Sequence, residues 1–404
     1  MTEIEYPHLE KVRDMLEACY RCGDCRIAYR PAVGRYMVCP VRETIPGKWE
    51  PFFARGKIML ANGLLQGHIK PSQRLAEIVF QCMICGSCQT ICNQSYHPSI
   101  NHPLSLIMDH PKIWESFRAE LIDRGYSIKR HDEILKSCED NHNPYFEKHE
   151  DRTKWVPNDK KFPKEAEYVL FMGCTEPYRN PDILQKMVKV LDFLGINYTI
   201  LGDDEWCCGS VALRTGNKKF ATELATHNYN AIKKAKGKKI ITHCAGCYRT
   251  LKKDYPEILP EFDLEVFHIT EIIQKFIDDN KFQIKDKIEM NVTYHDPCHL
   301  GRHMKIYDQP RNIINYLGAN LIEMKRIKEN SWCCGAGGGV KSGFPELANK
   351  IARSRIEEAL ETGTDALITA CPFCINNLRE ASNNEKTDKN IKVLDILDLI
   401  VEVI

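Results

Sequence analysis

The sequence has no long apolar run and no excess of charge of either sign. No stretch of about 18 apolar residues occurs, so we expect no helix of this chain to span a bilayer. Lys and Arg number 56 against 55 Asp and Glu, so no strong basic field attracts nucleic acid. The first residues, MTEIEYPHLEKVRDML, include no apolar h-region and are not typical of a signal peptide. These absences predict a cytoplasmic protein that reaches a membrane only by docking on a partner.

Cysteine, by contrast, is present in excess. The chain holds 19 cysteines, far more than packing requires, and a reducing compartment argues against disulfides. Thiolates bind soft metals, so metal or redox chemistry is the favoured interpretation. Eighteen of the cysteines fall into recognisable motifs. The remaining one, Cys138, is interpreted as a surface or packing cysteine in preference to a ligand.

The N-terminal region contains two copies of the motif C-x2-C-x2-C. This spacing lets three thiolates of one loop hold three corners of a [4Fe–4S] cube. The fourth ligand is a distant cysteine, which in two-cluster proteins serves the other cluster. Zinc sites are the alternative, but zinc motifs usually pair two C-x-x-C knuckles. We therefore predict two [4Fe–4S] cubanes, one held by Cys19, Cys22, Cys25 and Cys92, the other by Cys82, Cys85, Cys88 and Cys39.

The rest of the chain contains one five-cysteine pattern twice: a cysteine, then C-C-G, then C-x-x-C. The gap before C-C-G is 32 residues in the first copy and 34 in the second, and the gap after it is 35 and 36. Five thiolates exceed the four that a cubane or zinc needs, and adjacent cysteines fit one ordinary cubane poorly. The pattern therefore indicates an unusual cluster, with a structural zinc site as the alternative. The two sets are Cys174, Cys207, Cys208, Cys244 and Cys247, then Cys298, Cys333, Cys334, Cys371 and Cys374.

Each five-cysteine copy also has an alternating strand and helix pattern. The expected strands span 167–174, 196–201, 238–244 and 264–269 in the first copy, and 290–298, 319–324, 365–371 and 392–396 in the second. Helices are expected over 180–194, 217–235, 309–317 and 345–361. Strands that alternate with helices form right-handed βαβ units and a parallel sheet. The cysteines follow strands, so we expect them to converge at the carboxyl edge of each sheet.

The fold class predicted from these patterns is multidomain α+β. Residues 1–125 form a mainly helical ferredoxin-type domain, with helices expected over 8–18, 54–67 and 71–81. Residues 126–163 are polar and are interpreted as a linker that contains one short helix. Two repeated α/β domains follow, over 164–285 and 286–404.

Specific motifs carry a resemblance to a known family. GCTEP, EWCCGS and HCAGCY, followed by HDPCHLGR, WCCGAGGG and CPFC, resemble the two cysteine-rich CCG domains of heterodisulfide reductase. Together with the N-terminal two-cluster domain, the chain resembles the D subunit of the membrane-linked enzyme over about residues 10–385. The resemblance implies one noncubane [4Fe–4S] cluster on each five-cysteine set. It also implies that a disulfide, that of coenzyme M and coenzyme B, is reversibly reduced to two thiols between these clusters.

The resemblance makes all ten cysteines of the two sets candidate catalytic residues. His295, which precedes Cys298, is a candidate proton donor for thiolate products, although a structural hydrogen bond is the alternative role for it and for His243 and His299. Anionic parts of a thiol substrate would suit nearby basic residues, for which solvated surface charge is the alternative. These residues are Arg214, Arg249, Arg302 and Lys341.

The partners follow from what the sequence lacks and from the resemblance. No G-x-G-x-x-G fingerprint is present, and the glycines at 337–339 lack the G-K-[ST] ending of a phosphate loop. We therefore expect no flavin or nicotinamide on this chain, and a close backbone approach to a cluster at these glycines. Electrons would come from a partner subunit, implied by the resemblance to be a membrane b-type cytochrome or a flavin-containing subunit.

Related iron–sulfur subunits keep an alternative open. Those of glycolate, lactate and anaerobic glycerol-3-phosphate dehydrogenases share this layout and relay electrons without binding a disulfide. In many of them a C-x-x-C is degraded, whereas both sets are complete here, which favours disulfide chemistry. A relay that acts on a partner protein's disulfide in sulfur metabolism is a third possibility, and one related family places zinc in one such domain.

Overall fold

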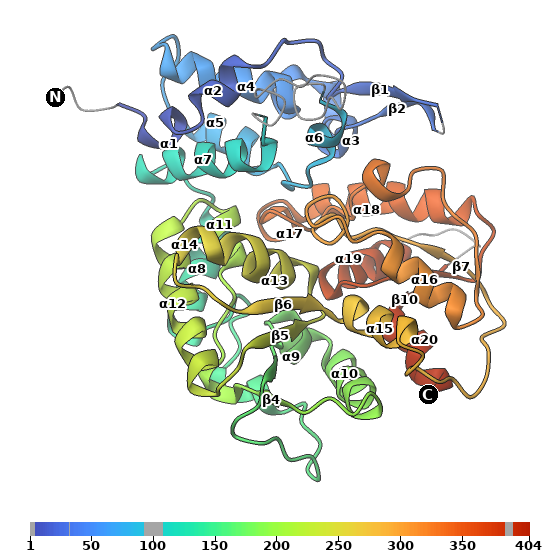
Figure 1. Ribbon diagram of the computed structural model, residues 1–404. Helices are drawn as coiled ribbons and strands as arrows, with labels where there is room; N and C mark the ends of the chain where they lie inside the picture. The colour runs from blue at the N-terminus through green and yellow to red at the C-terminus, as the bar shows by residue number, and fades with distance from the viewer. Residues whose placement is uncertain (1–4, 32, 93–107, 384–390) are drawn as a thin grey trace. The chain divides into compact units, whose positions relative to one another are not determined.

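The computed structural model describes residues 5–31, 33–92, 108–383 and 391–404 (Figure 1). The chain divides into two compact units. Unit 1 comprises Met1–Glu133, Val211–Lys218 and Lys325–Arg355. Unit 2 comprises Ile134–Ser210, Lys219–Met324 and Ile356–Ile404. The N-terminal region therefore shares a unit with the segments that follow the first C-C-G motif and surround the second.

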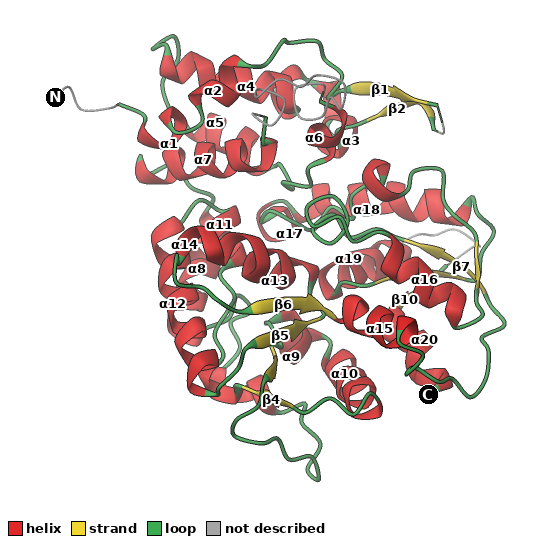
Figure 2. Cartoon of the chain, viewed as in Figure 1, coloured by secondary structure: helices red, strands yellow, loops and turns green. Residues whose placement is uncertain are grey.

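The N-terminal part of unit 1 is mainly helical, as predicted (Figure 2). Its helices are α1 (Pro7–Glu10), α2 (Arg13–Glu17), α3 (Pro40–Thr44), α4 (Ala54–Leu65), α5 (Gln73–Phe80), α6 (Ser87–Ile91) and α7 (His110–Asp123). Their core contains Phe53, Phe80, Trp114 and Phe117, all almost fully buried.

Two local features of unit 1 differ from the expectation. The helix expected over 8–18 is two short helices, because Val12 between them leaves helical backbone geometry. The sequence pattern also does not predict an antiparallel hairpin that the structure contains. It pairs β1 (Ile27–Arg30) with β2 (Gly34–Met37), and Ile27 faces Met37. Strands of four residues are too short for their alternation to stand out from the surrounding sequence.

Unit 2 holds two parallel sheets of identical topology. The first has the order β4-β3-β5-β6, and the second has the order β10-β9-β7-β8. In both sheets the first strand of the repeat lies between the second and the third, and the fourth lies beyond the third. Figure 1 shows β5 and β6 side by side. The strands are β3 (Tyr168–Leu170), β4 (Tyr198–Ile200), β5 (Lys239–Thr242), β6 (Glu265–His268), β7 (Asn291–Tyr294), β8 (Asn320–Leu321), β9 (Ala366–Thr369) and β10 (Lys392–Asp395). The prediction of two parallel α/β repeats is confirmed.

Helix α10 (Pro181–Phe193) of the first repeat buries one apolar face. In this helix, Ile183, Leu184, Met187 and Leu191 recur at helical spacing and are buried. The others in the first repeat are α9 (Thr175–Arg179), α11 (Ser210–Arg214), α12 (Lys218–Lys234), α13 (Ala245–Arg249), α14 (Tyr255–Ile258) and α15 (Ile269–Asp278). In the second they are α16 (Asp308–Tyr316), α17 (Val340–Gly343), α18 (Pro345–Leu360), α19 (Pro372–Asn383) and α20 (Ile396–Val403).

The segment predicted as a linker is well structured. It contains α8 (Lys129–Asn141), a helix of 13 residues, and a 3-10 turn over His149–Thr153. Arg152 and Trp155 of this segment are buried. No helix among the described residues is long and apolar enough to cross a bilayer.

Candidate functional site

The first five-cysteine set comes together at the carboxyl edge of its sheet. Cys174 follows β3, Cys244 follows β5, and all five cysteines are buried. A hydrogen bond with Cys207 raises the pKa of the Cys174 thiol well above its usual range. Hydrogen bonds from Cys207 and then Cys247 lower the pKa of Cys208 to about 5. The sulfurs therefore form one contiguous group.

Conversely, hydrogen bonds with Cys208 and then Cys244 raise the pKa of Cys247. No disulfide joins any of the 19 cysteines, all of which lie in the described part of the chain. A buried group of close thiols without disulfides fits a soft metal or an iron–sulfur cluster, because bound metal stabilises thiolates that burial would otherwise protonate.

A buried ion pair fixes the turn that carries Cys174. Arg152 lies 3.3 Å from Glu205, and neither side chain is exposed. Glu205 in turn accepts hydrogen bonds from the backbone N–H groups of Met172 at 3.0 Å and Gly173 at 2.8 Å. Arg152 also donates to the sulfur of Cys174 at 3.7 Å. Its positive charge favours the thiolate form of Cys174, which is the form that binds metal.

Cys138 lies beside this first set, although it belongs to no motif. Its side chain, on α8, has no exposed surface, which excludes the surface interpretation. A hydrogen bond with Cys207 is the largest of the causes that raise the pKa of Cys138, and the charges of Cys174 and Cys208 add to it. No motif marks this position in the sequence, since only the tertiary placement of α8 brings a sixth sulfur to the set.

The two repeats meet at their C-x-x-C motifs. Cys244 of the first repeat is within hydrogen-bonding reach of Cys371 of the second. Next to them, His243 lies 2.8 Å from Asp395, at the end of β10, and 3.5 Å from Glu176, in α9. All three side chains are almost fully buried. Burial alone would lower the pKa of His243. The nearby carboxylates raise it to about 10, and Asp395 contributes more to this rise than Glu176.

The second five-cysteine set is divided between the two units. Cys298, Cys371 and Cys374 belong to unit 2, whereas Cys333 and Cys334 belong to unit 1. A ring nitrogen of His295 lies within 4.8 Å of the sulfur of Cys374, and the ring is fully buried. His295 is thus placed beside a cysteine of the set, and its role as a proton donor stays a prediction, as does the assembly of all five ligands.

The N-terminal cysteines lie close enough to one another within unit 1 for their charges to interact. Burial raises the pKa of Cys39 to about 11, with contributions from the nearby charges of Cys82 and Cys85. Burial also raises the pKa of Cys88, with contributions from Cys82 and Cys85. The assignment of Cys39 to the second triplet stays a prediction, because its charge also acts on Cys25 of the first triplet.

Around the first triplet, burial raises the pKa of Cys25 to about 12, and the charges of Cys39, Cys19 and Cys22 add to this rise. Cys22 is the exposed member of this triplet. The assignment of Cys92 to this set stays a prediction.

Arg118 connects the loop of the second cysteine triplet to segments from both repeats. Fully buried in α7, it donates hydrogen bonds to the backbone carbonyls of Cys82 and Arg214, and to that of Gly338 at 2.7 Å. A Cβ atom at Gly338 would lie 2.7 Å from the carbonyl oxygen of Cys82, and one at Gly337 would lie 3.1 Å from that of Met83. The close backbone approach expected at these glycines is therefore to the Cys82–Met83 backbone.

The basic residues near the motifs are mostly not on the surface. Arg214, Arg249 and Arg302 are buried, so the interpretation as solvated charge is wrong for them. Arg214 forms an ion pair with Glu115, and Arg249 lies 3.7 Å from Asp254. Lys341 is partly exposed.

Comparison with known families defines the class of protein. Residues 15–96 match the 4Fe-4S dicluster domain, and residues 168–252 and 292–379 each match the cysteine-rich domain called CCG. A dicluster domain followed by two such domains is the layout of an iron–sulfur oxidoreductase.

The chain belongs to the family of heterodisulfide reductase D subunits. It is 37% identical over 399 residues to the D subunit of dihydromethanophenazine:CoB–CoM heterodisulfide reductase from Methanosarcina acetivorans, covering 96% of this chain and 93% of the relative. The same protein of Methanosarcina barkeri is 36% identical over 398 residues, with the same coverage.

A solved structure is similar in fold. A hypothetical protein from Helicobacter pylori matches with a TM-score of 0.58 at 12% identity, over 90% of this chain and 70% of that one. The resemblance drawn from the motifs is thus confirmed by sequence relatives, and the fold by an independent structure.

Proposed function

We propose that this chain is the catalytic subunit of a heterodisulfide reductase-type complex. It would reduce a small-molecule disulfide to two thiols, and the same site would oxidise thiols in the reverse direction. The relatives are named for the CoB–CoM heterodisulfide, which is therefore the proposed substrate. The observation that carries the proposal is the meeting of the two repeats at Cys244 and Cys371, because two metal-binding sets that meet could each hold one of the two sulfurs of a disulfide.

The cysteines would hold four clusters, two cubanes on the N-terminal sets and two noncubane [4Fe–4S] clusters on the five-cysteine sets. Clusters of this kind supply single electrons to a bound substrate and accept them from a donor. The complete five-cysteine sets favour this assignment over a zinc site, because a tetrahedral zinc needs only four ligands.

Buried charged groups near the contact between the repeats would supply protons to the thiolate products. Two thiolates need two protons, and His243, which lies 2.8 Å from Asp395 and 3.5 Å from Glu176, would supply one of them. In the second repeat, the ring of His295 lies beside Cys374 and would supply the other proton. Burial of these side chains excludes bulk water, which strengthens their electrostatic effect on a developing thiolate.

The electrons would come from a partner subunit, since the sequence has no dinucleotide fingerprint. The relatives are subunits of an enzyme whose name includes dihydromethanophenazine, so a membrane cytochrome is the proposed donor and a flavin-containing subunit the alternative. Docking on the cytoplasmic face of a membrane would follow from such a partner.

Cluster content and thiol binding test this proposal. We would purify the chain without oxygen, count iron and sulfide, and record EPR spectra with and without coenzyme M. Four clusters predict about 16 irons and a new paramagnetic signal when the thiol is added under oxidising conditions. A Cys371→Ser variant should keep the cubane signals and lose the thiol-dependent one. About 8 to 12 irons without any thiol-dependent signal would leave an electron relay as the function.

A further inference from the structure

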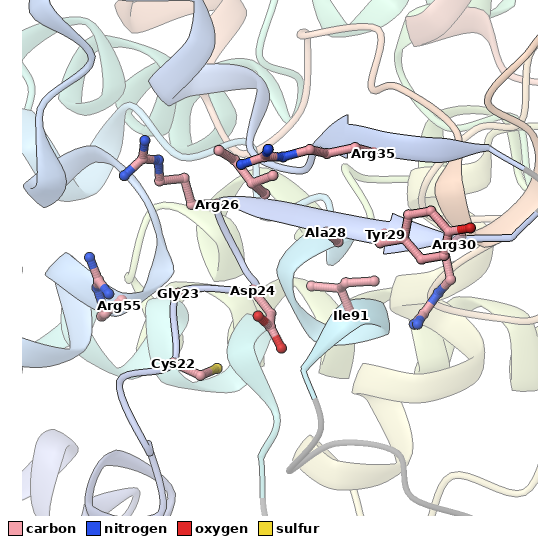
Figure 3. Close-up of a pocket in the computed structure, with 11 residues that line it drawn as sticks. Cys22, Gly23, Asp24, Arg26, Ala28, Tyr29, Arg30, Arg35, Arg55 and Ile91 are labelled. Carbon is pink, nitrogen blue, oxygen red and sulfur yellow. The ribbon is translucent and has the colours of Figure 1, made fainter.

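An open pocket in unit 1 lies directly over the loop of the first triplet. Its volume is about 610 Å³. The walls are Cys22 and Asp24 of the loop, the hairpin β1–β2, the start of α4 and the end of α6. Figure 3 shows the sulfur of Cys22 at this pocket. Cys22 is also the exposed cysteine of the first triplet.

The pocket is lined mainly by positive charge. Four arginines contribute to it against one acidic residue, Asp24: Arg26, Arg30, Arg35 and Arg55. They come from the loop before β1, from β1 and β2, and from α4, so separate segments of the chain place them around the pocket (Figure 3). Convergent guanidinium groups recognise carboxylates, often in bidentate geometry.

One of these arginines has a carboxylate partner within the chain, and the other three differ from it. Arg55 is bound on two nitrogens by the carboxylate of Glu50, at 3.2 Å and 2.7 Å. Arg30 donates to the uncharged carbonyl of Thr90 at 3.3 Å. Among the described residues, no ion pair forms with Arg26, Arg30 or Arg35. Three of the four guanidinium groups are therefore not neutralised by a carboxylate of the described residues.

The rim of the pocket has the composition of a protein interface. Tyr29, which lines it, is 67% exposed, and Met37 on the paired strand is 39% exposed. Tyr20, between the first two cysteines of the triplet, is 78% exposed. Tyrosine, methionine and arginine are enriched where proteins meet, whereas solvent-facing positions usually favour Lys and Glu.

We propose that this pocket is the docking surface for the protein that donates electrons, and that the donor presents an acidic patch to Arg26, Arg30 and Arg35. The proposal rests on the proposed function in one respect, that the first triplet holds a cubane which receives electrons. Complementary charge would speed and orient the encounter, and the exposed loop at Cys22 gives the shortest path from the donor to the bound cluster.

Rates of cluster reduction with donors of opposite charge test the proposal. The holoprotein would be mixed in a stopped-flow instrument with flavodoxin hydroquinone, an acidic protein donor, or with reduced methyl viologen, a cationic dye. Arg35→Gln and the double variant Arg26→Gln/Arg35→Gln would be compared with wild type. We expect the flavodoxin rate to fall about 3- to 10-fold and to lose its salt dependence, while the viologen rate rises. Because Arg35 is exposed, its single variant tests the idea even where the double variant folds poorly.

Arg74→Gln is the matched control. Arg74 lies on α5 of the same unit, is exposed, and pairs with Glu77, so its replacement removes a charge away from the pocket and should leave both rates unchanged. Equal loss with both donors would overturn the proposal, since the arginines would then act on the cluster. Unchanged rates in the arginine variants would also overturn it. Reduced anthraquinone disulfonate, a small anionic donor, is a further probe. A rate loss with this dye but not with flavodoxin would overturn the proposal too, because it would indicate a small anion as the occupant of the pocket. The mixtures contain no disulfide, so failure here is distinct from failure of disulfide reduction.

Discussion

The ring of His243 lies 2.8 Å from the carboxylate of Asp395, and this contact joins the first repeat to the second. His243 follows β5 and Asp395 ends β10, so residues about 150 positions apart in the chain share one buried ion pair. Asp395 also caps α20 by accepting from the backbone N–H of Leu397. The carboxylate thus fixes both the interface between the repeats and the start of the last helix.

Removal of this carboxylate should destabilise the protein strongly. Asp395→Ala leaves His243 buried with one remaining carboxylate, and breaking a buried pair typically costs about 3 to 5 kcal/mol. The control is Lys136→Ala, whose lysine is 64% exposed and pairs with exposed acids, so its loss should leave the free energy of unfolding almost unchanged. Chemical denaturation followed by circular dichroism measures both. Equal, small losses would show that the contact does not hold the repeats together.

Cys138 should influence the first cluster without being required for it. Cys138→Ala removes the hydrogen bond to Cys207, whereas the five motif cysteines remain. We expect an unchanged iron count and a shifted midpoint potential for the cluster proposed on the first five-cysteine set, because hydrogen bonds to ligand sulfurs set cluster potentials. EPR-monitored redox titration gives the potential. Loss of about four irons per chain would instead identify Cys138 as a ligand.

Arg118 should control electron transfer out of the cubane proposed on the second cysteine triplet. Arg118→Lys keeps the positive charge near Cys82 but cannot bind the carbonyls of Cys82, Arg214 and Gly338 at once. We expect the cubane potential to stay near the wild-type value and electron transfer to the noncubane clusters to slow about tenfold or more, since small misplacements of reacting groups have large effects. Rapid-freeze EPR after reduction of the cubanes measures the rate.

A second variant separates the geometry from the charge of Arg118. Gly338→Ala places a Cβ atom 2.7 Å from the carbonyl oxygen of Cys82, at a backbone φ of +62°. This change should slow the same step while Arg118 stays in place. If both variants transfer electrons at the wild-type rate, Arg118 has only a role in stability.

Mild acid should weaken unit 1 through His131. Burial lowers the pKa of His131 to about 4, and its ring contacts the carbonyl of Gly339 at 2.8 Å. A folded-state pKa below the unfolded value means that stability is lost as pH falls, here between about 6.5 and 4. From pH 7.5 to 5.5 we expect a loss of about 1 kcal/mol that is absent in His131→Asn. Denaturation at the two pH values checks this, and identical pH slopes in both proteins would contradict it.

Much of the site could be predicted from the sequence because its parts are local. Cys174, Cys244 and Cys371 each follow a buried strand of high β-propensity, and parallel strands bring their ends to one edge. The hairpin β1–β2 and the roles of Cys138 and Arg118 could not be predicted in this way. They depend on which segments fold against each other: α8 carries Cys138 to Cys207, and three carbonyls from distant segments meet at Arg118. The pairing of Asp395 with His243 has the same origin, because the two residues come from different repeats.

Thiol formation measured against electron input tests the central claim most directly. The anaerobic holoprotein would be given reduced methyl viologen and the CoM–CoB heterodisulfide, and both dye oxidation and free thiols would be counted. Disulfide reduction predicts that two thiols form for every two dye molecules oxidised. In the Cys371→Ser variant we expect this turnover to be lost, although the dye still reduces the cubanes. A protein with all four clusters that oxidises the dye no faster with the heterodisulfide than without it, and forms no thiol, would contradict the account.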